Sequence, residues 1–182
     1  MYQRLSEILL RLLIDSSSLI VLARVRALSA LPDVYVSIGL IRSVYDEVVT
    51  EGQTKGFADT ALVAKAVEAG WFSQIILTAE ELRVADAFVK KASGISHTDA
   101  QTLACARSRK LTLLIEDRRV RNVARAEGIS HITIQVFPLY GVVGRSLAAH
   151  GDDLLTRIGR AMNTDLAVVE ALRAAVREID RS

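Results

Sequence analysis

Cysteine and histidine, the residues that most often bind zinc, are scarce in this sequence. Cys105 is the single cysteine among 182 residues, so the chain can form neither an internal disulfide nor a cysteine-based zinc site. His97, His131 and His150 share no metal-ligand spacing, and we expect them in loops or at the surface. Cysteine and histidine therefore give no sign of a zinc site.

Uninterrupted apolar stretches are also lacking. Arg11, Asp15 and Arg24 divide the N-terminal apolar region before it reaches the roughly 18 to 20 residues needed to span a bilayer. Residues 1–13 include Glu7 and lack a small-residue cleavage site, so they do not resemble a signal peptide. We therefore expect no membrane helix and a cytoplasmic location.

Overall charge and aromatic content give no indication of nucleic-acid binding. The net charge of +2 is too small to steer the protein onto a polyanion, so such a partner would require a local basic patch. Aromatic residues make up 5% of the chain and form no recognisable stacking platform. The length and the 51% apolar content predict one globular domain over residues 1–150, with residues 151–182 as its helical C-terminal extension.

The chain does contain a regular alternation of short β-rich runs with longer helical patterns. This alternation predicts an α/β fold with a mostly parallel sheet covered on both faces. The expected strands are residues 12–14, 34–38, 111–115 and 132–136, with 72–77 as a weaker candidate. The expected helices are residues 16–27, 41–50, 57–69, 80–91, 98–109, 118–127, 152–162 and 164–179. Thr98 and Gln101 fit a capping box that would place Asp99 in the first turn of its helix.

Four acidic residues lie where such a sheet would gather them. Asp15 directly follows the first strand, and Asp117 follows residues 111–115 with one residue between. Glu47 belongs to the helix after the second strand, while Asp99 opens the helix that leads into residues 111–115. Because ligands bind beyond the carboxyl ends of parallel strands, all four acids can meet if the strands 12–14 and 111–115 are neighbours.

Taken singly, these acids have simpler roles. Asp15 and Asp117 suit helix N-caps, and Asp99 suits a first turn, where the helix dipole favours an acid. Glu47 is an ordinary solvated helix residue, and Asp46 beside it competes for any special role. The joint arrangement favours a site, because clustered carboxylates repel one another unless a cation compensates them.

The segments around these acids resemble the PIN-domain nucleases, including the VapC-type toxin ribonucleases, over about residues 11–142. The matching segments are Leu13-Ile14-Asp15-Ser16-Ser17-Ser18-Leu19-Ile20, Val44-Tyr45-Asp46-Glu47-Val48-Val49, Thr98-Asp99-Ala100-Gln101-Thr102-Leu103-Ala104 and Leu113-Leu114-Ile115-Glu116-Asp117-Arg118. The resemblance implies a three-layer α/β/α fold in which Asp15, Glu47, Asp99 and Asp117 bind Mg²⁺ or Mn²⁺. It also makes Ser17 a supporter of the site, although this serine is equally suited to capping its helix.

The function that the resemblance implies is metal-dependent hydrolysis of RNA, and the VapC-type likeness adds the role of toxin in a toxin–antitoxin pair. Similar nucleases are often homodimers bound to a small antitoxin, so we expect an RNA substrate, a homodimer and a possible antitoxin partner. Two alternatives remain open. The first is a catalytically silent PIN-like module that binds RNA or protein, and the second is a phosphoacceptor domain with Asp15 as the nucleophile.

A basic stripe adjoins the last of these acids. Arg118, Arg121 and Arg125 recur at spacings of three and four residues on the helix that follows Asp117. This stripe is either a solvated helix face or a surface that binds RNA phosphates. Because Arg118 is adjacent to Asp117, it is the first choice for a phosphate contact.

Overall fold

A five-stranded parallel sheet forms the centre of the molecule in the computed structural model, which describes residues 11–136 and 151–180. The strands are β1 (Arg11–Ile14), β2 (Ser37–Ile41), β3 (Ser73–Ile75), β4 (Thr112–Leu114) and β5 (His131–Ile132). Their order is β3-β2-β1-β4-β5, and every neighbouring pair is parallel. The predicted parallel α/β fold is therefore confirmed.

The order of the strands reverses direction at β1. The chain proceeds from β1 to β2 and β3 on one side, then returns to place β4 and β5 on the other side of β1. The pairing of Ile14 with Leu114 puts the carboxyl ends of β1 and β4 side by side. Parallel sheets bind ligands at such a switch point, so this edge is the first place to look for a site.

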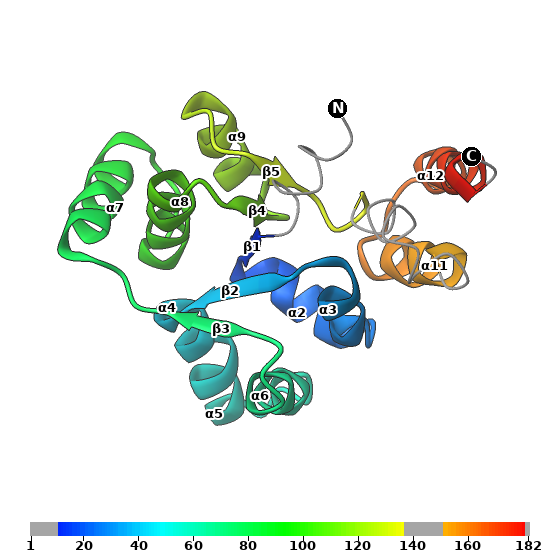
Figure 1. Ribbon diagram of the computed structural model, residues 1–182, viewed down its shortest axis with the longest axis horizontal. Helices are drawn as coiled ribbons and strands as arrows, with labels where there is room; N and C mark the ends of the chain where they lie inside the picture. The colour runs from blue at the N-terminus through cyan, green and yellow to red at the C-terminus, as the bar shows by residue number, and fades with distance from the viewer. Residues whose placement is uncertain (1–10, 137–150, 181–182) are drawn as a thin grey trace.

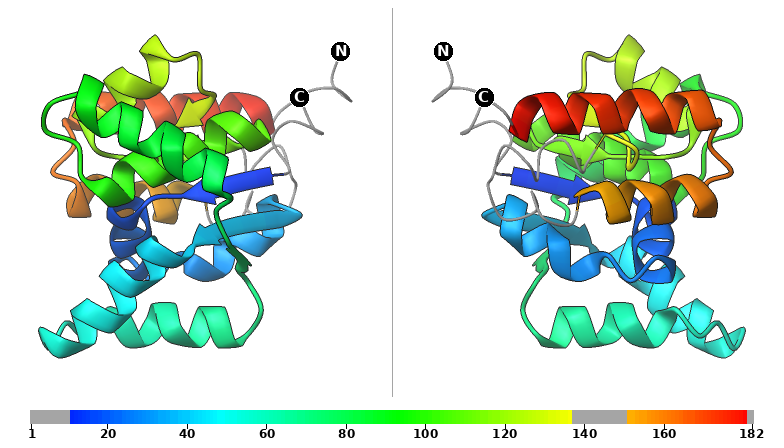
Figure 2. Two further views of the ribbon diagram at one scale, coloured as in Figure 1. Left: turned by 90° about the vertical axis from the view of Figure 1, so that its left-hand side faces the viewer. Right: turned by 90° about the vertical axis from the view of Figure 1, so that its right-hand side faces the viewer.

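Helices cover both faces of the sheet, giving three layers (Figures 1 and 2). In the left view of Figure 2, α7 and α8 lie in front of the sheet, and α11 and α12 lie behind it. The helical segments are α2 (Ser16–Arg24), η1 (Leu28–Ala30), α3 (Leu31–Val34), α4 (Arg42–Tyr45), η2 (Asp46–Glu51), α5 (Gly52–Thr54), α6 (Thr60–Glu68), α7 (Ala79–Lys91), α8 (His97–Arg109), α9 (Arg118–Ala126), α11 (Gly151–Ala161) and α12 (Leu166–Asp180). The arrangement is the predicted α/β/α fold.

The second strand lies later in the chain than predicted. Residues 31–34 form the short helix α3 with Pro32 at its start, where the missing amide hydrogen of proline does no harm. The strand then begins at Ser37, after Val36, whose side chain is 80% exposed. A local proline preference thus outweighed the β-branched run that predicted a strand over residues 34–38.

The last strand is shorter than predicted. Only His131 and Ile132 pair with β4, although residues 132–136 have a strand-like composition. The backbone amide of Ile134 donates to the carboxylate of Glu116 and not to a neighbouring strand. A side chain of the site thus replaces the strand partner and ends the sheet at this edge.

The C-terminal helices pack onto the sheet domain through α11, which contacts α2. Leu154 and Ile158 of α11 are buried in the main hydrophobic core. Arg157 donates to the carbonyl oxygen of Val25 at 2.6 Å, where the end of α2 leaves carbonyl groups without helical partners. No helix within the described residues has both the length and the apolar character to cross a membrane.

Candidate active site

Asp15 lies at the switch point between β1 and β4, and its side chain is almost fully buried. Its backbone amide donates to the carbonyl oxygen of Leu114 at 3.2 Å, which ties it to the end of β4. As the N-cap of α2, Asp15 accepts from the amide of Ser18 through Oδ1 at 2.8 Å and from the Ser17 hydroxyl through Oδ2 at 2.7 Å. The predicted supporter Ser17 therefore touches the carboxylate directly, while Asp15 also caps its helix.

Burial raises the pKa of Asp15, because removal from water disfavours the charged carboxylate. Hydrogen bonds from Ser18 and Ser17 act in the opposite direction, and the negative charge of Asp99 raises the pKa of Asp15 further. Asp15 and Asp99 are therefore close enough to repel one another electrostatically. A buried carboxylate beside a second acid is the environment that a bound cation would relieve.

Asp99 occupies the third position of α8, but the predicted capping box is wrong. The N-cap of α8 is Ser96, and the helix begins at His97. Ser96 donates to Asp99 Oδ2 through both its amide and its hydroxyl, each at 2.8 Å, and accepts from the amide of Asp99 at 3.0 Å. Ser96 and Asp99 thus form the reciprocal box assigned to Thr98 and Gln101, and the box orients the acid.

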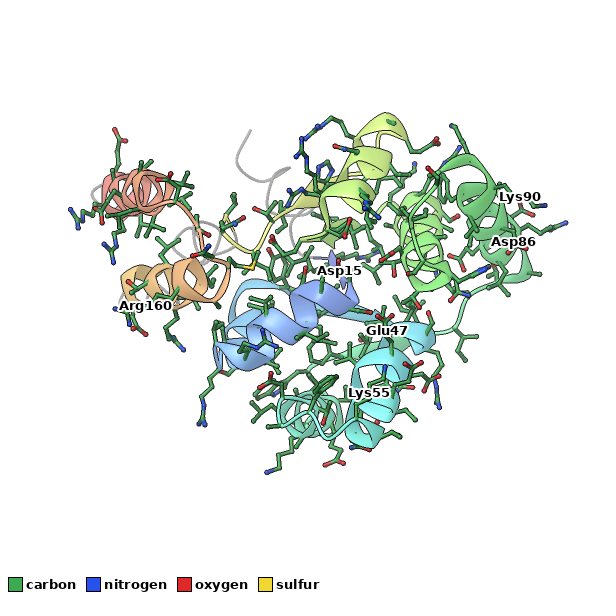
Figure 3. All side chains as sticks on the ribbon, turned by 180° about the vertical axis from the view of Figure 1, so that it is seen from behind. Asp15, Glu47, Lys55, Asp86, Lys90 and Arg160 are labelled. Atoms are coloured by element: carbon green, nitrogen blue, oxygen red, sulfur yellow. The ribbon has the colours of Figure 1, made fainter. Side chains whose placement is uncertain are left out.

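Glu47 lies in η2, a π-helical turn within a continuous helical segment over residues 42–54. Its Oε2 accepts from the hydroxyl of Ser16, the residue after Asp15, at 3.0 Å. Figure 3 shows Asp15 and Glu47 near one another on adjacent elements. Asp46, the competing acid, instead binds Arg42 at 3.0 Å. Turns of π-helix occur often at functional sites, and this one carries the acid that faces α2.

Asp117 is placed differently from the other three acids. It is exposed and caps α9, accepting through Oδ1 from the amides of Arg119 at 2.7 Å and Val120 at 3.1 Å. None of the interactions identified among the described residues joins it to Asp15, Glu47 or Asp99. Its local role is that of a helix cap, which was one of the two roles expected for it.

Glu116 is the acid that sequence reasoning missed. Its side chain is only 7% exposed and accepts from the amide of Ile134. Burial raises the pKa of Glu116, the Ile134 amide and the Arg121 guanidinium oppose this, and the charge of Asp15 adds to the increase. Glu116 therefore interacts electrostatically with Asp15, whereas the sequence indicated the next residue, Asp117. The signal available in the sequence was an acid directly after the buried Ile115.

Arg121 departs from the predicted basic stripe. Its Nη1 donates to the carbonyl oxygen of Glu116 at 3.0 Å and lies 3.7 Å from the Glu116 carboxylate. It therefore compensates a buried acid, while Arg118 and Arg125 are exposed on α9. Of the three arginines of the predicted stripe, Arg118 and Arg125 therefore keep exposed side chains.

The acids fit a metal ion that retains much of its water. Among residues 11–136 and 151–180, no three Asp, Glu, His or Cys side chains gather closely enough to enclose one ion. Mg²⁺ needs only one or two carboxylates, because it keeps several waters. Asp15 and Asp99, with serine hydroxyls nearby, offer hard oxygen ligands of this kind. The residues present therefore fit Mg²⁺ or Mn²⁺ better than a fully protein-coordinated ion.

Comparison with known proteins agrees with the architecture. A family model described as a PIN domain matches residues 11–136, which is more than half of the chain. A comparison with curated proteins finds no match. The matched span begins at β1 and ends after β5, so it covers the whole sheet and the acidic edge. By this match and by its five-stranded parallel sheet between helical layers, the chain belongs to the PIN-domain family, whose fold is that of nucleases.

Proposed function

We propose that this protein is a Mg²⁺- or Mn²⁺-dependent endoribonuclease. The observation that carries the proposal is the buried Asp15 at the switch point of the sheet, with the negative charges of Asp99 and Glu116 near it. Burying a carboxylate beside other acids costs folding free energy, and a bound cation would compensate this cost. Metal-dependent phosphodiester hydrolysis uses this combination of groups.

Asp15 and Asp99 would hold the ion directly, and Glu47 would act through water or on a second ion. Asp117 is the fourth acid that the resemblance assigns to the metal, and it lies beyond Glu116 at the same edge. When bound, the ion lowers the pKa of a water ligand and offsets negative charge on the cleaved phosphodiester. Ser17 keeps the Asp15 carboxylate in one orientation, and Ser16 does the same for Glu47.

The exposed arginines of α9 would bind the RNA backbone. Arg118 and Arg125 extend from the acidic edge along one helix, so they can contact successive phosphates. Contacts of this kind add affinity that depends on salt and carries little sequence information. Arg121 contributes indirectly, because it holds Glu116 in place.

The wider setting that we propose is a homodimeric toxin controlled by a small antitoxin. This part rests on the resemblance to VapC-type ribonucleases. A catalytically silent PIN-like binding module is the second candidate. The observation that favours it is the engagement of Asp99 and Asp117 in helix caps, which uses carboxylate oxygens that a metal would need.

The test compares cleavage of structured and unstructured RNA by the wild type, Asp15→Asn and Asp99→Asn, with Mg²⁺, Mn²⁺ or chelator. Asp86→Asn is the matched control, because Asp86 is exposed on α7, away from Asp15 (Figure 3). Metal-stimulated cleavage that is lost in the first two variants and kept in the control supports the enzyme. Equal cleavage by all four proteins reveals a contaminant, and absence of cleavage by the wild type favours the silent module. Covalent phosphate on Asp15 without cleavage indicates a phosphoacceptor.

A further inference from the structure

A cavity of about 370 Å³ opens directly beside Glu47, between α2, the helix 42–54 and the start of α6. Its walls are apolar side chains such as Ile20, Val48 and Val63. Arg24, Lys55 and Asp59 supply charged groups around these walls. The volume falls in the range of roughly 300–1,000 Å³ typical of small-ligand pockets. The cavity is separate from the carboxylate cluster but shares Glu47 with it.

Phe57 lines this cavity, and a fixed loop presents its ring. The chain leaves α5 through a Schellman motif, in which Phe57 N donates to Gly52 O and Gly56 N donates to Gln53 O, both at 3.0 Å. Gly56 adopts the left-handed conformation at φ +75° that this motif requires. On the other side, Thr60 Oγ1 donates to the carbonyl oxygen of Phe57 at 2.6 Å. The backbone of Phe57 is therefore held on both sides.

Phe57 nevertheless remains 60% exposed, and the sequence explains why. In a Schellman motif the residue at this position usually packs on a side chain three residues before the helix end. Gly52 occupies that place here and has no side chain to offer. An added Cβ at Gly52 would meet Thr60 Cγ2 at 2.3 Å, so close packing of α6 excludes a larger residue. The backbone of Phe57 is thus held in place, and within residues 11–136 and 151–180 no side chain covers the exposed part of Phe57.

The two cations beside the cavity are only loosely paired. Arg24 lies 3.4 Å from Asp59, and Lys55 lies 3.2 Å from Glu51, with the cationic side chains 61% and 59% exposed. Ion pairs as exposed as these contribute little, so both cations can exchange their partners for phosphate oxygens. Figure 3 shows Lys55 further along the helix that carries Glu47.

We infer that this cavity binds one unpaired nucleotide of an RNA substrate, with its base against Phe57 and its flanking phosphates near Lys55 and Arg24. The inference rests on the proposed ribonuclease function and extends it. Because Glu47 both lines the cavity and accepts from Ser16 beside Asp15, the bound nucleotide lies close to the bond that is cut. Single-stranded RNA is recognised by splayed bases that stack on aromatic rings and hydrogen-bond through their edges.

The lining favours a base over a protein side chain. Asp59 and Glu47 can accept from exocyclic amino groups of a base. An aromatic ring carried by a fixed backbone, with carboxylates and cations around it, matches a planar heterocycle that has both donors and acceptors. The cavity therefore requires RNA with an accessible, unpaired nucleotide at one position relative to the cut.

The test uses a defined RNA and a set of copies in which one nucleotide at a time is abasic. Stacking on one aromatic residue predicts that Phe57→Ala raises KM about tenfold and leaves kcat nearly unchanged. Phe57→Trp should restore the KM of the wild type. With the wild type, an abasic nucleotide at one position should raise the KM about tenfold. With Phe57→Ala, the same abasic RNA should have the KM of the intact RNA.

Matched controls separate this effect from general damage. Leu166→Ala removes another exposed apolar side chain, on α12, and should leave KM unchanged. Lys55→Gln should reduce the salt dependence of RNA binding by about one phosphate contact, whereas Lys90→Gln on α7 should not. The inference is overturned if Phe57→Ala keeps both the KM and the abasic profile of the wild type. Loss of a protein partner in that variant would not rescue it, because the cavity would then bind protein and not RNA.

If the protein cuts no RNA, the proposed ribonuclease function is wrong, but the nucleotide site can still be tested by binding. Fluorescence anisotropy then measures binding of a short single-stranded RNA by the wild type and by Phe57→Ala, without metal. A loss of affinity of about tenfold in the variant supports the nucleotide site in a silent module. Equal affinities, with unchanged thermal unfolding, refute it.

Discussion

Glu81 at the start of α7 supports the sharpest stability prediction, because its charge is buried and paired. The side chain is 3% exposed and binds Arg109 through two hydrogen bonds, from Nε at 2.7 Å and from Nη2 at 2.9 Å. Arg109 Nη2 also donates to the carbonyl oxygen of Ile76 at 2.8 Å. Glu81 completes a capping box with Thr78, whose amide donates to it at 2.7 Å. These contacts join α7, the end of α8 and the chain after β3.

The hydrogen bonds from Arg109 lower the pKa of Glu81 from 4.5 to about 2, against the opposing effect of burial. Because the folded-state pKa is depressed, the stabilisation is fully present above the unfolded pKa and declines as the pH falls below it. The full difference corresponds to about 3 kcal/mol of unfolding free energy, of which about 2 kcal/mol should be lost by pH 3. The affected pH range therefore extends from 4.5 down to about 2.

The assay is urea unfolding of the wild type and Glu81→Gln between pH 7 and pH 3. Other acids titrate equally in both proteins, so the difference in unfolding free energy isolates Glu81. The unfolding free energy of the wild type relative to Glu81→Gln should fall by about 2 kcal/mol between pH 7 and pH 3. Glu80→Gln, at an exposed neighbouring position, should follow the wild type throughout. A constant difference between the wild type and Glu81→Gln at every pH would show that Arg109 does not lower the pKa of Glu81.

Three further changes have defined outcomes. Gly52→Ala should lower the free energy of unfolding by about 1–3 kcal/mol in urea, because the new Cβ meets Thr60 Cγ2 at 2.3 Å; an unchanged midpoint would contradict the packing argument. Ser17→Ala should reduce metal-stimulated RNA cleavage about tenfold by freeing the Asp15 carboxylate, and equal kcat would remove Ser17 from the site. Burial raises the pKa of the Cys105 thiol to about 11, so a thiol reagent at pH 8 should modify it only after denaturation; rapid modification of the native protein would argue against this environment.

The parallel sheet was predictable because strands buried on both faces read as continuous apolar runs. Leu12 to Ile14 and Leu113 to Ile115 are all buried, and each run is followed by an acid. Their adjacency in the sheet could not be read from composition, since it depends on how the chain crosses over. Asp15 could therefore be placed from the sequence at the carboxyl edge of the sheet, whereas the residues beside it depended on one strand pairing.

Details of the acidic edge depended on short-range competition that residue spacing does not resolve. Glu116 and Asp117 are adjacent, and either could have turned toward Asp15. Asp117 satisfies the free amides at the start of α9, which leaves Glu116 to turn inward against Arg121. The contact between Ser16 and Glu47 spans 31 residues and has no local signature. Phe57 could not be identified from the sequence for a similar reason. A single aromatic residue can stack on a base only when a loop holds it at the surface, and residue spacing does not show such a loop.

Asp15 combines a structural and a chemical role, and one substitution can separate them. As an N-cap it accepts from the amide of Ser18, and asparagine can perform the same task. As a buried carboxylate with a raised pKa, it destabilises the fold at neutral pH wherever no cation is bound. Asp15→Asn should therefore be more stable than the wild type in chelator, although it loses activity.

Added Mg²⁺ or Mn²⁺ should reduce the difference in stability between Asp15→Asn and the wild type. An ion that binds only the folded wild type raises its stability by mass action, while the asparagine variant gains little. Thermal unfolding of both proteins in chelator and in increasing Mg²⁺ or Mn²⁺ measures this directly. A variant less stable than the wild type in chelator would mean that the cap needs the charge itself. In that case, the burial of Asp15 would reflect helix capping and would no longer support a metal site.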